Sequence, residues 1–226
     1  MMTHRLRDGL AFCLVDGTPV FLDVKRDRYF TVDARLADVF TAFVRAERLP
    51  EEYLARLVRA GIVEPGSRDG APPPAPPSIR APSSSLLEEA GTKDSGAPPN
   101  AGVAWAVACS VAGARMRLAL RGFAHCMERL RARNVAGRTR ALVGARAALS
   151  LAADFNEARR LLPAAPNCLT DSLALADFLM RRGANAQFVI GVRSNPHGAH
   201  CWLQTDEILL NEASDRAAAF TPILVI

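Results

Sequence analysis

The stretch that decides the fold is PNCLTDSLAL at residues 166–175, because it places a cysteine at the start of a helix. Asn167 is a good N-cap, and the apolar run after it predicts a helix from Cys168 to Arg182, closed by Gly183 in the left-handed conformation. A thiol in the first helical turn lies near the positive end of the helix dipole, among N–H groups that lack intrahelical partners. These groups favour the reactive thiolate and offer backbone donors to an oxyanion.

Two predicted strands and a turn follow this helix. Ala186–Val192 is apolar on both faces, which is typical of a central strand, and Ala199–Gln204 alternates, which predicts a second strand carrying His200. A turn at Asp206-Glu207 then leads into ILLNE, residues 208–212. A helix-borne cysteine, a strand-borne histidine and then a carboxylate or amide one strand later is the chain order of papain-like and transglutaminase-like folds. In such sites the histidine takes the thiol proton and the third residue orients the ring.

Each of these residues also has a purely structural interpretation. A single cysteine at a helix start is usually a small buried apolar residue, and a single histidine on a strand is usually a satisfied core residue. His197, His200 and Cys201 suggest a metal cluster, but His200 and Cys201 point to opposite faces of a strand, so no metal site is expected. The residues alone therefore leave the catalytic and the structural interpretations open.

Four motifs occur in order in the C-terminal part of the chain: CLxxSLAL (168–175), Arg182-Gly183, IGVR (190–193) and AHxW (199–202). Together they resemble the leader peptidase of lasso-peptide biosynthesis, the B protein, whose catalytic part belongs to the transglutaminase-like superfamily. The expected fold class is therefore α+β, with a papain/transglutaminase-like cysteine peptidase domain at residues 101–226 whose first part is helical. The resemblance implies neither a metal nor an organic cofactor.

In that family the third catalytic residue is usually Asp, and the matching position here is Glu212. The register of the strand pair leaves a second candidate. With a plain two-residue turn, Glu212 opposes Cys201 and Asn211 shares the face of His200, whereas a three-residue loop or a bulge sets Glu212 opposite His200. We therefore expect Cys168, His200 and Glu212 to be catalytic and keep Asn211 as the alternative third residue.

Two further expectations concern the surroundings of the thiol. The backbone N–H of Cys168 is the first candidate oxyanion donor, and the side chain of Gln187 is a second. Asp171 stands where the family commonly has a basic residue. An acid so near Cys168 is expected to oppose formation of the thiolate.

The first module spans residues 1–65 and combines short β-like runs with two amphipathic helices. The runs are Gly9–Val15, Val20–Val24 and Arg28–Val32, and the helices are Ala34–Arg48 and Glu51–Ala60. This order predicts a winged-helix-like unit. Because winged helices commonly bind DNA, a small DNA-binding domain and a purely structural domain are the alternatives to a more specific role.

The motifs FC (12–13), FLD (21–23) and DRYF (27–30) resemble the precursor-recognition domain of the same lasso family. There an extended leader peptide adds as a strand beside the third strand. Such pairing is physically sound, since an edge strand offers unpaired N–H and C=O groups. The resemblance therefore implies leader-peptide binding at Arg28, Tyr29, Phe30 and Val32.

Between the two modules, residues 66–100 are rich in Pro, Ala, Ser and Gly, which predicts a mobile, partly extended linker without a core. Three helices are then expected, Val103–Ala114, Leu118–Arg133 and Thr139–Leu162, with their arginine-rich faces in solvent. The uncharged apolar run of the first helix is too short to span a bilayer, so no membrane span is expected.

Charge and cysteine content restrict the function classes. The net charge is +5, but the chain has only two Trp and two Tyr and no nucleic-acid-reading motif, so nucleic acid is not an expected partner. Five cysteines without CxxC spacing, and a start without a long apolar segment, predict a cytoplasmic protein with reduced thiols.

The expected function is that of a cysteine peptidase which binds the leader of a ribosomally made precursor peptide and cuts it from the core. The resemblance adds one partner, an ATP-dependent lasso cyclase similar to asparagine synthetase, which takes the freed amine. Two other classes stay open. One is an acyl transferase that makes an amide crosslink on the same Cys-His site, and the other is a non-catalytic adaptor that delivers the leader to another enzyme.

Overall fold

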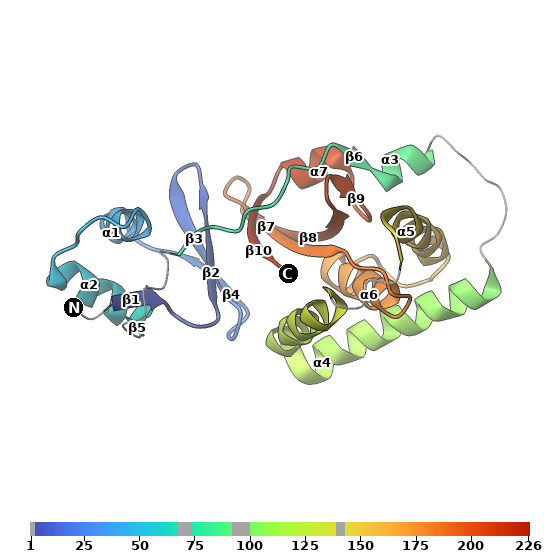
Figure 1. The fold of residues 1–226 in the computed structure, drawn as a ribbon, viewed down its shortest axis with the longest axis horizontal. Helices are drawn as coiled ribbons and strands as arrows, with labels where there is room; N and C mark the ends of the chain where they lie inside the picture. The colour runs from blue at the N-terminus through green and yellow to red at the C-terminus, as the bar shows by residue number, and fades with distance from the viewer. Residues whose placement is uncertain (1–2, 67–73, 92–99, 139–142) are drawn as a thin grey trace. The chain divides into compact units, whose positions relative to one another are not determined.

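A computed structural model describes residues 3–66, 74–91, 100–138 and 143–226 of the chain. The chain divides into two units, Met1–Pro77 and Ser78–Ile226 (Figure 1). Each unit has its own helices and strands, so the predicted α+β class is confirmed.

The N-terminal unit contains the three predicted strands and the two predicted helices, in the predicted order. They are β2 (Leu10–Val15), β3 (Thr18–Asp23), β4 (Arg28–Thr31), α1 (Ala34–Val44) and α2 (Glu51–Arg59). A further antiparallel pair, β1 (Thr3–Leu6) and β5 (Val63–Gly66), joins the two ends of the unit. The sequence did not predict β1, because THRL shows no alternation of apolar and polar residues.

Aromatic rings build the core of this unit between the β2-β3-β4 sheet and α1. Phe40 on α1 meets the rings of Phe12 and Phe21 edge-on, at centroid distances of 4.9 and 4.8 Å. Phe30 stacks on Phe21 at 5.1 Å. Phe30 therefore belongs to the core of the sheet, although its strand β4 lies at the sheet's edge.

The C-terminal unit surrounds one five-stranded sheet with helices. Its helices are α3 (Leu86–Gly91), α4 (Ala101–Arg138), α5 (Ala145–Arg160), α6 (Cys168–Met180) and α7 (Ser214–Ala218). Its strands are β6 (Ser84–Ser85), β7 (Gln187–Arg193), β8 (Gly198–Thr205), β9 (Ile208–Leu209) and β10 (Thr221–Val225). The sheet order is β10-β7-β8-β9-β6, antiparallel except for the parallel pair of β6 and β9.

Helix α6 lies at the centre of this unit, because it packs on β8 while α4 and α5 pack against it (Figure 1). Every residue from Ser172 to Leu179 is buried, which explains why the segment is apolar around its whole circumference. The one charged residue in this run, Asp177, forms ion pairs with Arg117 and Arg133 of α4. For these two arginines the expectation of a solvated face is wrong, because a buried carboxylate requires a partner.

Helix α4 consists of two helical stretches joined at Gly122, whose φ of 76° is not helical. The sequence predicted the break between Ala114 and Leu118. The chain instead continues as a helix there and breaks at the glycine, the residue that tolerates a positive φ. The next predicted helix also differs: α5 begins at Ala145, and residues 139–142 lie outside the described residues.

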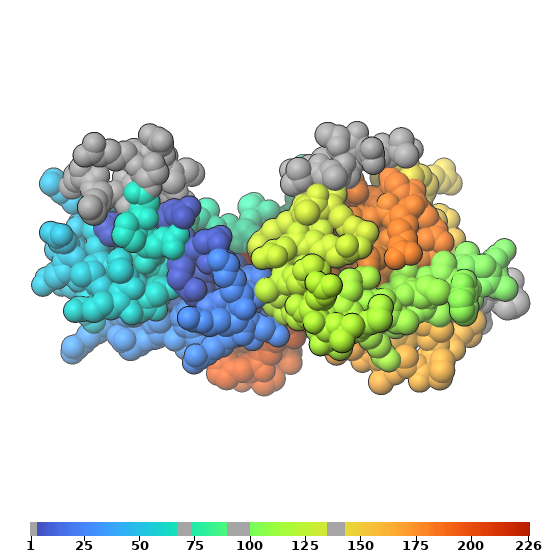
Figure 2. Space-filling view, turned by 90° about the horizontal axis from the view of Figure 1, so that it is seen from below, coloured from blue at the N-terminus to red at the C-terminus, as the bar shows by residue number. Residues whose placement is uncertain are grey.

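Among the described residues, α4 is the one helix whose length and composition would allow it to cross a membrane, with a mean hydropathy of 1.4 over its most apolar 18 residues, 22% of them buried. Its inner side buries Val107 and Val111, whereas its outer side leaves Trp105 72% exposed. Figure 2 shows α4, in green to yellow-green, along one face of the C-terminal unit. The inner side packs on α6, as in a core helix of a folded domain. The absence of a membrane span stays a prediction.

The predicted linker of residues 66–100 is too long. The boundary between the units lies after Pro77, and β6 and α3 belong to the C-terminal unit. Ser84 and Ser85 pair with Ile208 and Leu209 of β9. This pairing uses backbone groups and has no side-chain pattern, so composition did not reveal it. Residues 67–73 and 92–99 of the predicted linker lie outside the described residues.

Candidate active site

Helix α6 begins at Cys168, as predicted. The Asn167 side chain accepts a hydrogen bond from the N–H of Thr170 at 3.0 Å, so it is the N-cap. At the other end, Gly183 has a φ of 75°, in the left-handed region expected there. Cys168 therefore lies in the first helical turn, beside N–H groups that have no intrahelical acceptor.

Asp171 does not face the thiol as an unpaired charge. Its carboxylate accepts two hydrogen bonds from Arg159 of α5, at 2.8 and 3.2 Å, and one from the N–H of Asn167 at 3.1 Å. Arg159 also donates to the carbonyls of Ala164 and Ala165. The expectation that Asp171 opposes the thiolate is therefore corrected: the arginine compensates the charge of the carboxylate, and the pair holds the loop that leads to Cys168.

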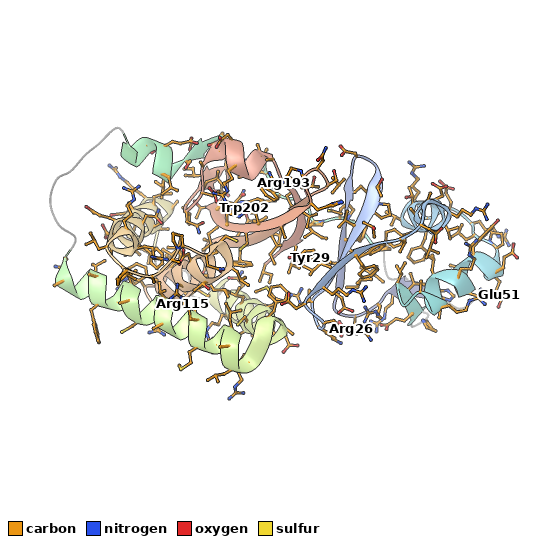
Figure 3. All side chains as sticks on the ribbon, turned by 180° about the vertical axis from the view of Figure 1, so that it is seen from behind. Arg26, Tyr29, Glu51, Arg115, Arg193 and Trp202 are labelled. Atoms are coloured by element: carbon orange, nitrogen blue, oxygen red, sulfur yellow. The ribbon has the colours of Figure 1, made fainter. Side chains whose placement is uncertain are left out.

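His200 lies on β8, opposite Gly191 of β7, and is buried. Its ring lies between Trp202, at a centroid distance of 6.3 Å, and Phe220, at 5.3 Å. Gly191 leaves room for both neighbours, since a Cβ at this position would come within 2.8 Å of Phe220. Trp202 and Arg193, on β8 and β7, are labelled in Figure 3, and the Arg193 guanidinium lies 4.9 Å from the Phe220 ring centroid.

The turn at Asp206-Glu207 is the plain two-residue turn, because Thr205 pairs with Ile208. On an unbroken ladder this register would bring Asn211 to the face of His200. The β9 ladder stops at Leu209, however, and the chain then bends. As a result, the carboxylate of Glu212 contacts Nε2 of His200 directly.

Asn211 has a different set of partners. Its Oδ1 accepts the N–H of Leu203 at 2.8 Å, and its Nδ2 donates to the hydroxyl of Ser172 at 2.9 Å. Ser172, which is fully buried on α6, in turn donates to the carbonyl of Cys201 at 3.2 Å. Asn211 therefore links β8 to α6, and the structure places Glu212, not Asn211, at the histidine.

The sulfur of Cys168 forms hydrogen bonds with both Cys201 and His200. Against the effect of burial, the Cys201 thiol, the His200 ring and the Cys201 backbone N–H lower the pKa of Cys168 to about 4. Conversely, the bonds to Cys168 and Glu212 raise the pKa of His200 to about 9. Between these two values the pair exists as a thiolate and an imidazolium. Because Glu212 occupies Nε2, Nδ1 is the ring nitrogen left for the bond to Cys168.

Glu212 is held as a carboxylate. Burial acts to raise its pKa, but the hydrogen bonds from His200 and from the N–H of Ala213 outweigh burial, so the pKa lies below its ordinary value. The Ala213 bond measures 3.0 Å, and Arg216 lies 3.9 Å from the carboxylate. A charged acceptor on Nε2 favours the imidazolium and fixes the orientation of the ring.

Cys201 is the site residue that sequence reasoning missed. The strand alternation placed it on the face opposite His200, which led away from a shared role. That face is the one on which α6 packs, and the Cys201 thiol thereby meets Cys168. The bond to Cys168 and burial together raise the pKa of Cys201 well above its ordinary value, so it acts here as a thiol donor.

Gln187 is not at the site. It pairs with Gln204, four residues along β7 from Gly191, the partner of His200. At about 3.3 Å per residue this separation is roughly 13 Å, beyond the reach of a glutamine side chain. The alternative oxyanion donor is therefore wrong, and the N–H of Cys168 stays the predicted donor.

In the N-terminal unit, the four residues predicted to bind leader peptide lie on or beside β4, which among the described residues pairs only with β3. Arg28 and Tyr29 are exposed, Tyr29 by 38% (Figure 3). Phe30 and Val32 instead pack against the core. The edge thus presents backbone groups together with two exposed side chains.

Comparison with known proteins gives one family. The transglutaminase-like superfamily matches residues 110–225, a segment that contains α6, β7, β8 and the Glu212 loop. No curated protein and no solved structure matches the chain. Proteins of this superfamily commonly use a cysteine in peptidase or acyl-transfer chemistry, which agrees with the site geometry. The chain therefore belongs to the transglutaminase-like superfamily.

Proposed function

We propose that the chain is a cysteine peptidase that removes the leader from a ribosomally made lasso precursor peptide. The observation that carries the proposal is the contact of Cys168 with His200 and of His200 with Glu212, with the cysteine in the first turn of α6. A thiolate at a helix start, paired with an imidazolium that a carboxylate orients, is a nucleophile with its proton donor already in place.

The chemistry proceeds in two steps. The Cys168 thiolate attacks the carbonyl carbon of the scissile bond, and the N–H of Cys168 donates to the oxyanion. His200 gives its Nδ1 proton to the leaving amine, which frees the core peptide and leaves a thioester on the leader. His200 then takes a proton from water, the hydroxide adds to the thioester, and the leader leaves with a free carboxylate.

Substrate recognition is assigned to the N-terminal unit. Support comes from the resemblance of its motifs to precursor-recognition domains and from the edge position of β4. An extended leader would add as a further strand there, with contacts to Arg28, Tyr29, Phe30 and Val32. The same resemblance suggests an ATP-dependent cyclase, similar to asparagine synthetase, that consumes the freed amine. A cytoplasmic setting is supported instead by the five cysteines without CxxC spacing.

The decisive experiment incubates the purified chain with a lasso precursor peptide, in water enriched in ¹⁸O, with and without a lasso cyclase. Hydrolysis yields two fragments, and the leader carboxylate gains one ¹⁸O atom by mass spectrometry. Cys168→Ala is expected to abolish cleavage, whereas Cys109→Ala, at an exposed cysteine outside the site, is expected to retain it.

The other outcomes separate the rival classes. In the arm without the cyclase, an amide-linked product without ¹⁸O would identify an acyl transferase, and binding of the precursor without any change in its mass would identify an adaptor. Fluorescence anisotropy tests recognition: Tyr29→Ala should weaken leader binding while leaving the fold intact, because Tyr29 is exposed. Phe30→Ala is a poor probe, since it removes a ring from the core.

A further inference from the structure

The loop that carries Glu212 has no regular secondary structure, yet it is held at successive positions by distant residues. The Leu210 carbonyl accepts a hydrogen bond from Asn156 of α5 at 2.6 Å. The Asn211 side chain accepts the N–H of Leu203. The next two anchors, at the Glu212 carbonyl and at Ser214, come from a segment that composition alone had assigned to the linker.

This segment, Arg80–Glu89, is called the strap. Its first anchor is the Arg80 carbonyl, which accepts a hydrogen bond from the fully buried Gln204 at 3.0 Å. The N–H of Ser83 then donates to the carbonyl of Glu207 at 2.8 Å. After that the strap pairs with β9 as β6 and continues as α3.

Ser85 is the point at which the strap meets the Glu212 residue itself. The side chain is buried, with 1% exposure. Its hydroxyl donates to the carbonyl of Glu212 at 2.6 Å and accepts the N–H of Leu87 at 3.1 Å. The hydroxyl therefore caps the start of α3 and holds the Glu212 backbone at the same time. Three residues on, the carboxylate of Glu88 accepts both the N–H and the hydroxyl of Ser214, at 2.7 and 2.9 Å.

We propose that Ser85, assisted by Glu88, is a positioning residue that holds the Glu212 carboxylate against His200. The β9 ladder ends three residues before Glu212, so the sheet does not fix this residue. A catalytic carboxylate has to stay within about 0.5 Å of its productive position. The strap supplies that constraint, because Ser85 holds the Glu212 carbonyl and Glu88 holds the residue two positions after it.

The first test needs no substrate. His200 is one of four histidines, and its ring can be followed by NMR in ¹³C-labelled chain, assigned with His200→Gln. The bonds to Cys168 and to Glu212 raise the pKa of His200 to about 9. Ser85→Ala loosens the Glu212 backbone and is expected to lower this pKa. Ser83→Ala is the matched control, because the Ser83 hydroxyl lies on the same strap but, within the described part of the chain, bonds to Glu207 and not to Glu212.

Two further variants keep the test decisive. Glu88→Asp retains the charge but shortens the reach to Ser214, so it is expected to lower the His200 pKa, as Ser85→Ala does. Because Glu88 is exposed, this substitution should leave folding intact. In a Glu212→Gln background, Ser85→Ala should produce no additional change. Three results would each overturn the proposal. Ser83→Ala could lower the His200 pKa as much as Ser85→Ala does, or the His200 titration could be unchanged in both Ser85→Ala and Glu88→Asp. The third is a full Ser85→Ala effect in the Glu212→Gln background.

The kinetic arm rests on the proposed peptidase function. Ser85→Ala is expected to lower kcat for precursor cleavage by up to about 100-fold with KM unchanged, the loss typical of a misplaced catalytic group. If the wild-type chain does not cleave precursor, the peptidase function fails while the titration still decides whether Ser85 positions Glu212. If Ser85→Ala cleaves the precursor with an unchanged kcat, the peptidase function is supported and the positioning role of Ser85 is refuted.

Discussion

Cys168 meets three groups in the folded chain: the thiol and the backbone N–H of Cys201, and the imidazole of His200. Each of them stabilises the negative sulfur, and the start of α6 adds its unpaired N–H groups. The other cysteines differ, since burial raises the pKa of Cys13 to about 12 and also raises that of Cys126. Cys168 is therefore the thiol expected to react at low pH.

Iodoacetamide should alkylate Cys168 selectively between about pH 5 and 6, because its pKa of about 4 leaves the thiolate formed there, unlike an ordinary thiol. Peptide mapping by mass spectrometry locates the label. His200→Ala removes a group that lowers the Cys168 pKa, so labelling should move to higher pH. Cys109→Ala should change nothing, and labelling of wild-type Cys168 only above about pH 8 would contradict the thiolate.

Substitutions at the neighbours Glu212 and Asn211 should affect different properties, the first the cleavage rate and the second the stability. Glu212→Gln removes the negative charge that contacts Nε2 of His200. The kcat for cleavage should therefore fall by about 100-fold or more, while the free energy of unfolding is nearly retained. Asn211→Ala leaves the Leu203 N–H without its acceptor and should cost about 1–3 kcal/mol of unfolding free energy, while the folded fraction keeps its activity. Cleavage rates and urea unfolding separate the two. A severe kcat loss in Asn211→Ala alone would reverse the assignment.

At the scale of elements, β7 and β8 hold the histidine through close packing at a glycine. Gly191 lies opposite His200, and the space above it is filled by Phe220 and by the ring of Trp202. Both side chains flank the imidazole. The strand pair therefore fixes the direction of the His200 ring by shape, in addition to the hydrogen bond that the ring donates to Glu212.

Gly191→Ala should destabilise the C-terminal unit by about 1–3 kcal/mol, as overpacking of a filled core does. A Cβ there would lie 2.8 Å from Phe220 Cβ and 3.0 Å from the Trp202 ring. Gly198→Ala on the neighbouring strand is the matched control, because its nearest contact would be an ordinary 3.5 Å. Urea denaturation measures both variants, and equal midpoints would show that the site repacks freely.

At the scale of the whole molecule, the chain divides after Pro77, and the strap lies on the C-terminal side of that boundary. A fragment of residues 78–226 keeps Ser85 and Glu88, whereas the fragment 100–226 suggested by composition alone lacks both. The two fragments differ in residues 78–99, which comprise the strap, the rest of α3, the residues up to α4, and Ile79, which packs against the core beside Trp202. They therefore measure the contribution of this whole segment to the site.

Residues 78–226 should retain acid-pH alkylation of Cys168 and a His200 pKa of about 9. Residues 100–226 should unfold at lower temperature and show a lower His200 pKa, since the Glu212 loop has lost its anchors. Calorimetry and histidine NMR on both fragments provide the comparison. Identical behaviour would mean that the strap is dispensable and that the domain starts near residue 100.

What the sequence determined by itself is local or periodic. The Asn167 cap and the Gly183 terminus gave the helix that starts at Cys168, and alternation gave the strand of His200, because caps and strand faces depend on neighbouring residues. These features gave the chain order of a Cys-His site, whereas the α+β class and the catalytic interpretation also needed the resemblance of the motifs to a known family.

Only the tertiary structure decided the third residue, the paired state of Asp171 and the contact of Cys201 with Cys168. Each depends on a partner from another element: Ser85 is 127 residues from Glu212 in the chain, and Arg159 belongs to a different helix from Asp171. The sequence left the turn register open between two alternatives, and it did not predict the end of the β9 ladder. A strand ends where competing contacts outweigh further pairing, and those contacts come from side chains that are distant in the sequence.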